Sequence, residues 1–141
     1  MATKRHIGVA DVTYKADVDL TGVQYYFVTA ASTAGNVKVA TGASNPAPLG
    51  VLQNSPSLGQ EARLSMLGPT KVFAVTPSTC GIAQGRYVTV NASGQAIPLA
   101  TESGSPIVGR NIGNVNAPVS ASRFIEIFFF GPLSACAVSA S

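Results

Sequence analysis

The sequence predicts an all-β protein, a small β-barrel or β-tulip-like domain of short antiparallel strands with an extended N-terminal arm. Only 11% of the residues are charged, 46% are hydrophobic, and 14 glycines and 9 prolines are spread along the chain. This composition suits short strands and tight turns better than helices. Short apolar runs also alternate with clusters of Gly, Pro, Asn and Ser. Within Glu61–Leu67 the apolar side chains recur at every second residue, which is the period of a strand.

The length of 141 residues is that of one ordinary domain. We expect an N-terminal arm over residues 1–16, a β-barrel domain over 17–132 and a short C-terminal tail over 133–141. The first segment is basic and weakly patterned, with no strong strand. It is either a frayed terminus or an arm that becomes ordered on a partner.

The first strand is expected at Leu20–Thr29, which is rich in Val, Tyr and Phe. A turn over Ala30–Gly35 then leads into a second short strand, Asn36–Ala40. The two segments predict a hairpin that spans Gly22 to Ala40.

The central stretch, Pro48 to Val75, predicts strand, turn, strand, turn, strand. Its three apolar runs are Leu49–Leu52, Ala62–Leu67 and Lys71–Val75, and the second turn is expected at Gly68-Pro69-Thr70. In the middle run Ala62, Leu64 and Met66 would point one way and Glu61, Arg63, Ser65 and Leu67 the other. One face of this strand should therefore be buried.

A second hairpin is predicted from Arg86–Asn91 and Gln95–Leu99, joined by a tight turn at Ser93-Gly94. Pro98 indicates that the returning strand is short or lies at an edge. The following run Pro106–Asn114 echoes Pro48–Asn54, because each is a Pro-led apolar strand that carries a glycine and ends in Asn. We interpret this echo as weak internal pseudo-symmetry, with the glycines at bulges or close backbone approaches.

The last strand is expected at Ser122–Phe130, with Gly131-Pro132 ending it. Both of its faces are apolar, which is typical of a strand covered on two sides. The residues expected in the core or in a trimer interface are Phe124, Ile125, Ile127, Phe128, Phe129 and Phe130.

Catalysis, metal binding and cofactor binding have little support in the sequence. His6 is the only histidine, and no Gly-rich phosphate-binding motif is present. Asp17 and Asp19 could face the same way, but a solvated turn explains them better than a cation site. Cys80 and Cys136 lie far apart and suit free thiols in a reducing cytoplasm.

No clustered basic stripe indicates nucleic-acid binding, and the longest aromatic-aliphatic run, Phe124–Phe130, is too short to span a bilayer. No apolar signal segment follows Lys4 and Arg5. A surface with so little charge is typical of a protein that is partly covered by a partner.

Several runs in order resemble the capsid cement, or head decoration, proteins of tailed bacteriophages. They are the Tyr-rich segment after Asp19, the run from Pro48 to Val72, the Gly85-Arg-Tyr-Val step, the Ala92-Ser-Gly-Gln turn, and Ile107-Val-Gly followed by a closing apolar strand. The resemblance covers about residues 19–130. It implies a barrel domain, commonly a homotrimer, that sits on the outside of the mature head and bridges major capsid subunits, with no enzymatic activity and no cofactor.

The protein would then be found in the virion and, during assembly, in the host cytoplasm. An arm that orders on the shell would pair its main chain with a capsid strand and place its cations against acidic groups. The expected capsid contacts in the arm are Thr3, Lys4, Arg5, His6, Ile7 and Val9. Two alternatives remain open: a virion-surface receptor- or glycan-binding module that uses Tyr25, Tyr26 and Tyr87, and an enzyme with a site that the sequence does not reveal.

Overall fold

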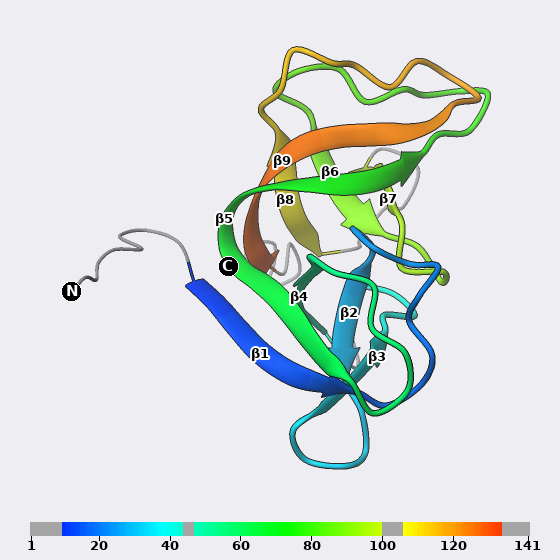
Figure 1. Cartoon of the computed structure of the whole chain (residues 1–141). Helices are drawn as coiled ribbons and strands as arrows, with labels where there is room; N and C mark the ends of the chain where they lie inside the picture. The colour runs from blue at the N-terminus through cyan, green and yellow to red at the C-terminus, as the bar shows by residue number, and fades with distance from the viewer. Residues whose placement is uncertain (1–9, 44–46, 100–105, 134–141) are drawn as a thin grey trace.

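The computed structural model describes residues 10–43, 47–99 and 106–133 of the chain. Within these residues the fold is all-β, with nine strands and no α-helix, as expected (Figure 1). The strands are β1 (Ala10–Ala16), β2 (Phe27–Ala30), β3 (Asn36–Val39), β4 (Pro48–Leu52), β5 (Glu61–Val75), β6 (Tyr87–Val90), β7 (Ala96–Pro98), β8 (Ile107–Asn111) and β9 (Ser122–Leu133).

The strands close into two small barrels that share β5. Pairing runs β1-β3-β2-β4-β5 and returns to β1, which we call the first ring. It then runs β5-β7-β6-β8-β9 and returns to β5, which we call the second ring. In Figure 1, β5 passes from the first ring, below, into the second ring, above. The predicted barrel is confirmed, and it is made of two closed rings rather than one.

The two rings repeat the same topology. In each ring the first strand pairs in parallel with the third, β1 with β3 and β5 with β7, while the other pairs are antiparallel. The sequence predicts that all strands are antiparallel, and the two parallel pairs correct that expectation. Two predicted hairpins, β2–β3 and β6–β7, are confirmed and occupy equivalent positions.

The repeat extends to single hydrogen bonds. The buried hydroxyl of Thr29 donates to the carbonyl of Ala47 over 2.7 Å, and the buried hydroxyl of Thr89 donates to the carbonyl of Pro106 over 2.8 Å. Leu20 N–H donates to Pro56, and Ile82 N–H donates to Ala117 in the same way. The predicted echo lies in β4 and β8, so the pseudo-symmetry read from two short runs belongs to the fold of the whole chain.

The prediction of a turn at Gly68-Pro69-Thr70 is wrong, because β5 continues through these residues without a break. Gly68 has a φ of 109°, which L residues rarely adopt, and it bends the strand. Before the bend β5 pairs with β1 as far as Leu67; from Gly68 onward it pairs with β9. Pro69, which has no N–H to donate, lies on the exposed surface of the bend.

The prediction that the last strand ends at Gly131-Pro132 is also wrong. β9 runs through Gly131-Pro132 to Leu133, and Gly131 has a φ of 83°. A Gly-Pro step therefore bends both long strands instead of ending them.

Two further differences concern the start of the chain. Of the expected strand Leu20–Thr29, only the part from Phe27 onward is extended, because Tyr25 has a φ of 71° and the residues before it form turns. Residues 10–16 of the expected arm form β1, which pairs with β5 in an antiparallel register from Ala10 to Lys15. The main-chain hydrogen bonds to β5 hold this weakly patterned segment as a strand.

The interior contains two apolar clusters, one in each ring. The first is built on Leu20, Val28, Leu52, Ala62 and Leu64. As predicted, Ala62 and Leu64 are buried and Met66 packs against this cluster, although Ser65 on the other face is buried too. The second cluster contains the buried side chains of β9 and also Phe27 of β2. The aromatic side chains of Phe27 and Phe129 lie with their centroids 5.8 Å apart. The first and second rings of strands therefore pack together as one body.

Two further findings concern single features of the described residues. Cys80 is a free, half-buried thiol, whereas Cys136 lies outside the described residues. No helix in the part of the chain that the structure describes could cross a membrane.

Gly50 and Gly109 sit where one strand approaches another closely, as expected for the echoing segments. A Cβ on Gly50 would lie 2.6 Å from the carbonyl oxygen of Ser65, and one on Gly109 would lie 2.8 Å from that of Phe128. Each glycine lies beside a register shift in its pairing. The two glycines adjoin these bulges, and the close approach of the neighbouring strand leaves no room for a side chain at either position.

Replacing Gly50 by alanine is therefore expected to lower the free energy of unfolding by about 1–3 kcal/mol, because the main chain of β5 has to move. Gly22→Ala is the matched control, since a Cβ there meets nothing within 4 Å. Chemical denaturation of the two variants measures the difference. Equal stabilities would contradict the close approach.

Candidate interaction surface

A row of exposed side chains crosses four strands on the outer face of the second ring. Directly opposite residues in antiparallel strands lie on the same face. The register pairs Tyr87 of β6 with Arg110 of β8, Arg110 with Phe128 of β9, and Phe128 with Pro69 of β5. Tyr87 is 45% exposed and Phe128 is 39% exposed. This row places two large aromatic side chains beside a cation on the surface.

An aromatic cluster lies farther along the same face. Phe124 of β9 lies opposite Phe73 of β5, with ring centroids 5.2 Å apart. Tyr25 meets Phe124 edge to face at 5.7 Å. The Lys71 ammonium lies 5.2 Å from the centre of the Tyr25 ring and 5.7 Å from that of Phe124. Each such cation–π contact is worth about 0.5–1 kcal/mol at an exposed site, so the cluster holds Lys71 in place.

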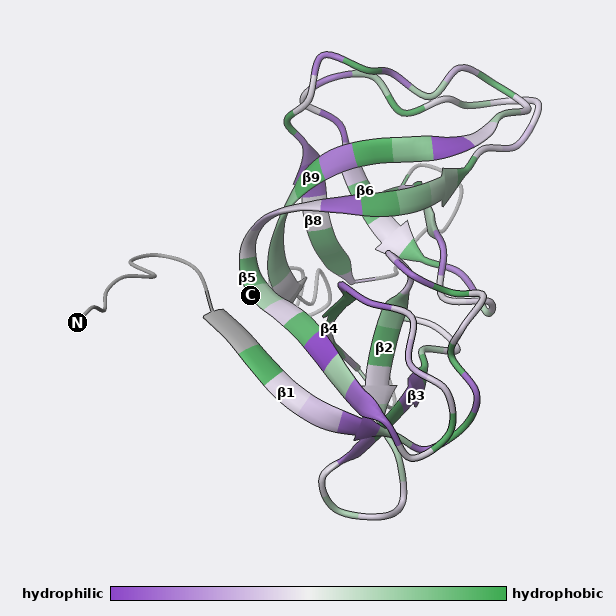
Figure 2. Ribbon diagram, viewed as in Figure 1, coloured by the Kyte–Doolittle hydropathy of each residue, from purple (hydrophilic) through white to green (hydrophobic). Residues whose placement is uncertain are grey.

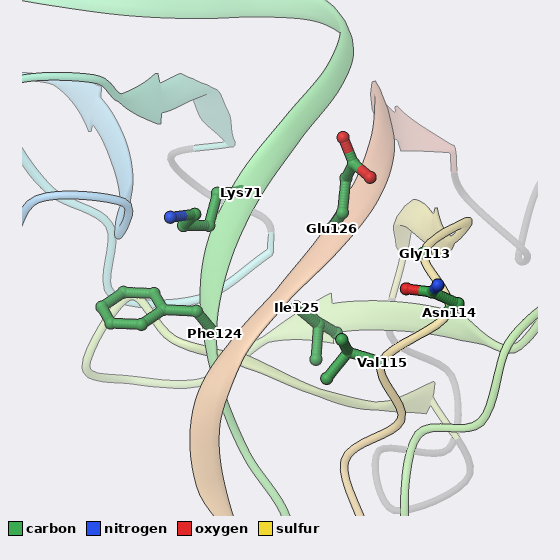
Figure 3. A pocket seen from close by; sticks show the side chains of 7 residues that line it. All are labelled: Lys71, Gly113, Asn114, Val115, Phe124, Ile125 and Glu126. Atoms are coloured by element: carbon green, nitrogen blue, oxygen red, sulfur yellow. The ribbon is translucent and has the colours of Figure 1, made fainter.

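A depression of about 290 Å³ lies beside the cluster (Figure 3). It is lined by Lys71, Gly113, Asn114, Val115, Phe124, Ile125 and Glu126. Figure 3 shows Lys71 and Phe124 on one side of β9 and Asn114 and Val115 on the other. Glu126 lies opposite Lys71 in the register, so a carboxylate and an ammonium share this part of the face.

A second depression, of about 350 Å³, lies beside Phe128. It is lined by Tyr87, Ile107, Arg110, Phe128 and Phe130. We call the surface made by the row, the cluster and the two depressions the outer face. In Figure 2 green apolar bands alternate with purple polar ones along β9. Exposed Phe and Tyr side chains among charges of both signs are typical of protein-binding surfaces.

The six β9 residues singled out from the sequence divide between the two sides of the strand. Ile125, Ile127 and Phe129 are at most 2% exposed and belong to the core of the second ring. Phe124 and Phe128 point outward, and Phe130 is half-buried. Within the chain only one face of β9 is covered, because Phe124 remains 47% exposed, and the expected trimer interface on the other face stays a prediction.

The arm residues Thr3, Lys4, Arg5, His6, Ile7 and Val9 lie outside the described residues. Of the tyrosines considered for glycan binding, only Tyr87 is exposed. Tyr25 and Tyr26 are half-buried where the two rings meet, and Tyr26 stacks on Phe73 with ring centroids 5.6 Å apart.

The hydrogen bonds of Asp17 and Asp19 support the interpretation that these residues belong to a turn. The Asp19 carboxylate accepts from the N–H of Thr21 over 3.1 Å, which is a local turn contact. Asp17 accepts from the Asn36 side-chain amide over 3.0 Å. Among the described residues, no group of three or more His, Cys, Asp and Glu side chains is arranged to hold a metal ion.

Sequence reasoning missed Pro69, Lys71, Phe73 and Arg110 as surface residues. The signal was present in β5, where Leu67, Pro69, Lys71 and Phe73 follow at every second position. The predicted turn at Gly68 interrupted this alternation and concealed it.

Comparison with known proteins shows the fold. No protein-family model matches the chain, and no curated protein matches it. A solved structure, "The crystal structure of head fiber gp8.5 N base in bacteriophage phi29", is similar with a TM-score of 0.58 and 17% identity. The similarity covers 89% of this chain and 98% of that one. The chain therefore has the same fold as that base over nearly its whole length.

Proposed function

We propose that this chain is a structural protein of a bacteriophage head. It binds the outside of the mature head as a cement or decoration protein and bridges major capsid subunits. One observation carries the proposal: the fold matches, over 89% of the chain, the base of a head fibre. The motif resemblance of residues 19–130 to head decoration proteins supports the same role independently of the fold.

The outer face serves as the seam of a homo-oligomer, most simply a homotrimer. It offers exposed Phe124 and Phe128 for burial, and it carries Lys71, Arg110 and Glu126, so a second copy can meet it with opposite charges. Aromatic side chains and arginine are enriched at such interfaces. The repeat of one seam around a closed ring of subunits needs no other partner.

Bridging requires a second contact, which we assign to the arm. The segment that precedes β1 carries Lys4 and Arg5 and joins β1 at Ala10. Main-chain pairing with a shell strand, together with contacts from these cations to acidic shell groups, offsets the loss of conformational entropy when the arm becomes ordered.

Deletion of residues 1–9 tests this assignment and leaves β1 intact, because β1 begins at Ala10. We expect the truncated protein to keep its thermal stability and its mass by light scattering. It should no longer pellet with expanded empty heads of the cognate phage. Undiminished pelleting would contradict the arm contact.

A charge-matched pair refines the test. Replacing Lys4 and Arg5 by alanine should weaken pelleting, whereas replacing the exposed barrel residues Lys38 and Arg86 by alanine removes the same charge and should not. A full-length monomer that ignores heads and binds an array of glycans would contradict the proposal and favour the receptor-binding alternative.

A further inference from the structure

One edge of β1 has main-chain groups without a partner among the described residues. The hydrogen bond from Ala16 N–H to the Gln60 carbonyl and the register of β1 on β5 direct the main chain of Val12 and Tyr14 toward β5. The N–H and C=O groups of Asp11 and Thr13 therefore point to the opposite edge. There β3 pairs only with Lys15 and Ala16.

In the second ring, the residue equivalent to Thr13 has a hydrogen-bond partner for its outward N–H group. Thr76 N–H donates to Ala121 as Ala16 N–H donates to Gln60, so Phe73 in β5 is the equivalent of Thr13 in β1. Phe73 N–H donates to the main-chain carbonyl of Tyr25 over 3.0 Å. In the first ring, the described part of the chain offers Thr13 no such carbonyl.

The described residues leave the space beside the edge open. β1 and β3 separate on the N-terminal side of Lys15 and enclose a depression of about 470 Å³. It is lined by Thr13, Tyr14, Lys15, Ala34, Gly35, Asn36 and Glu61. Val12, which precedes Thr13 in β1, is 38% exposed. A strand beside Thr13 would cover Val12 and place a side chain in this depression.

A second copy of the chain fits this edge poorly. If the contact between the two rings were repeated between copies, the loop equivalent to Tyr25-Tyr26 would be Gly85-Arg86, because both segments pair with their fourth strand in the same way. Gly85 and Arg86 have no rings to replace the Tyr26–Phe73 stack and the Tyr25–Phe124 contact.

We propose that the outer edge of β1 receives an extended segment of the major capsid protein, which adds a strand to the first ring. Its main chain pairs with Thr13 and Asp11. Of the exposed charged side chains described beside the edge, the cations Lys15 and Arg63 outnumber the carboxylate Glu61, so this surface favours a segment that carries carboxylates. This inference rests on the proposed function, and it assigns the shell contact to a surface of the barrel in addition to the arm.

Thr13→Pro in the full-length chain tests the inference. Proline removes the outward N–H and blocks an incoming strand, while an edge position whose N–H faces solvent tolerates it. Thr13→Val is the control, because it keeps the N–H and the strand propensity. We expect Thr13→Pro to weaken binding to expanded empty heads by about tenfold or more, and Thr13→Val to leave it unchanged.

Each outcome is decisive. If wild type and Thr13→Pro pellet equally, the inference is wrong and the proposed function stands. If wild type itself does not pellet, both are wrong. Should Thr13→Pro fail to fold, hydrogen exchange of the wild-type Thr13 amide decides: slower exchange on heads supports strand addition, and unchanged exchange overturns it.

Discussion

Replacing Phe129 by alanine is expected to lower the free energy of unfolding by about 3–5 kcal/mol, which is the usual loss for a fully buried phenylalanine. Phe129 is 1% exposed and packs against Phe27, with ring centroids 5.8 Å apart. The substitution would leave a cavity where the cores of the two rings meet. Denaturant titration of the purified variant measures the loss.

Phe128→Ala is the matched control one residue away. Its side chain points outward and is 39% exposed, so its removal should lower the free energy of unfolding by about 1 kcal/mol or less. Both variants are compared as monomers at low protein concentration, where the proposed seam contributes nothing. Similar losses at Phe128 and Phe129 would contradict the orientation of β9.

The second large effect is expected on self-association. Replacing both Phe124 and Phe128 by serine should leave a folded monomer, because each exposed aromatic at the centre of a seam contributes about 2 kcal/mol or more to binding. Light scattering over a concentration series gives the mass, and a thermal melt confirms that the fold is kept.

Leu58→Ser and Val119→Ser together form the control for that variant. These side chains are 67% and 51% exposed and line neither depression of the outer face. They should leave the oligomer intact. An oligomer that survives the loss of Phe124 and Phe128 would mean that the outer face is not the seam.

Much of the fold could be predicted from the sequence, because period-2 alternation and turn residues act locally. Glycine in a tight turn identified the β6–β7 hairpin, where Gly94 has a φ of 79°. The buried side of Glu61–Leu67 followed from the positions of Ala62 and Leu64. The echo between Pro48 and Pro106 correctly indicated internal symmetry.

The errors arose where long-range pairing overrides a local preference. A Gly-Pro step normally ends a strand, but in β5 it bends a strand that has a partner on each side of the bend. Tyr25 occurs in an apolar, β-prone run, yet it adopts a φ of 71° because its N–H and carbonyl bond to Leu52 and Phe73. Such contacts depend on closure of the rings, which no short window of sequence reveals.

The candidate surface was predictable only in part. Phe124 and Phe128 could be named as apolar, but whether a strand is covered on one face or two depends on what packs over it. The neighbours Lys71 and Arg110 join them only through the register of β5 and β8 on β9.

The most direct test is a cryo-electron microscopy reconstruction of expanded empty heads incubated with the purified protein. We expect added density on the outer surface that contacts more than one major capsid subunit, with β1 nearest the shell. Heads without added density, or density that touches a single subunit only, would contradict the bridging role.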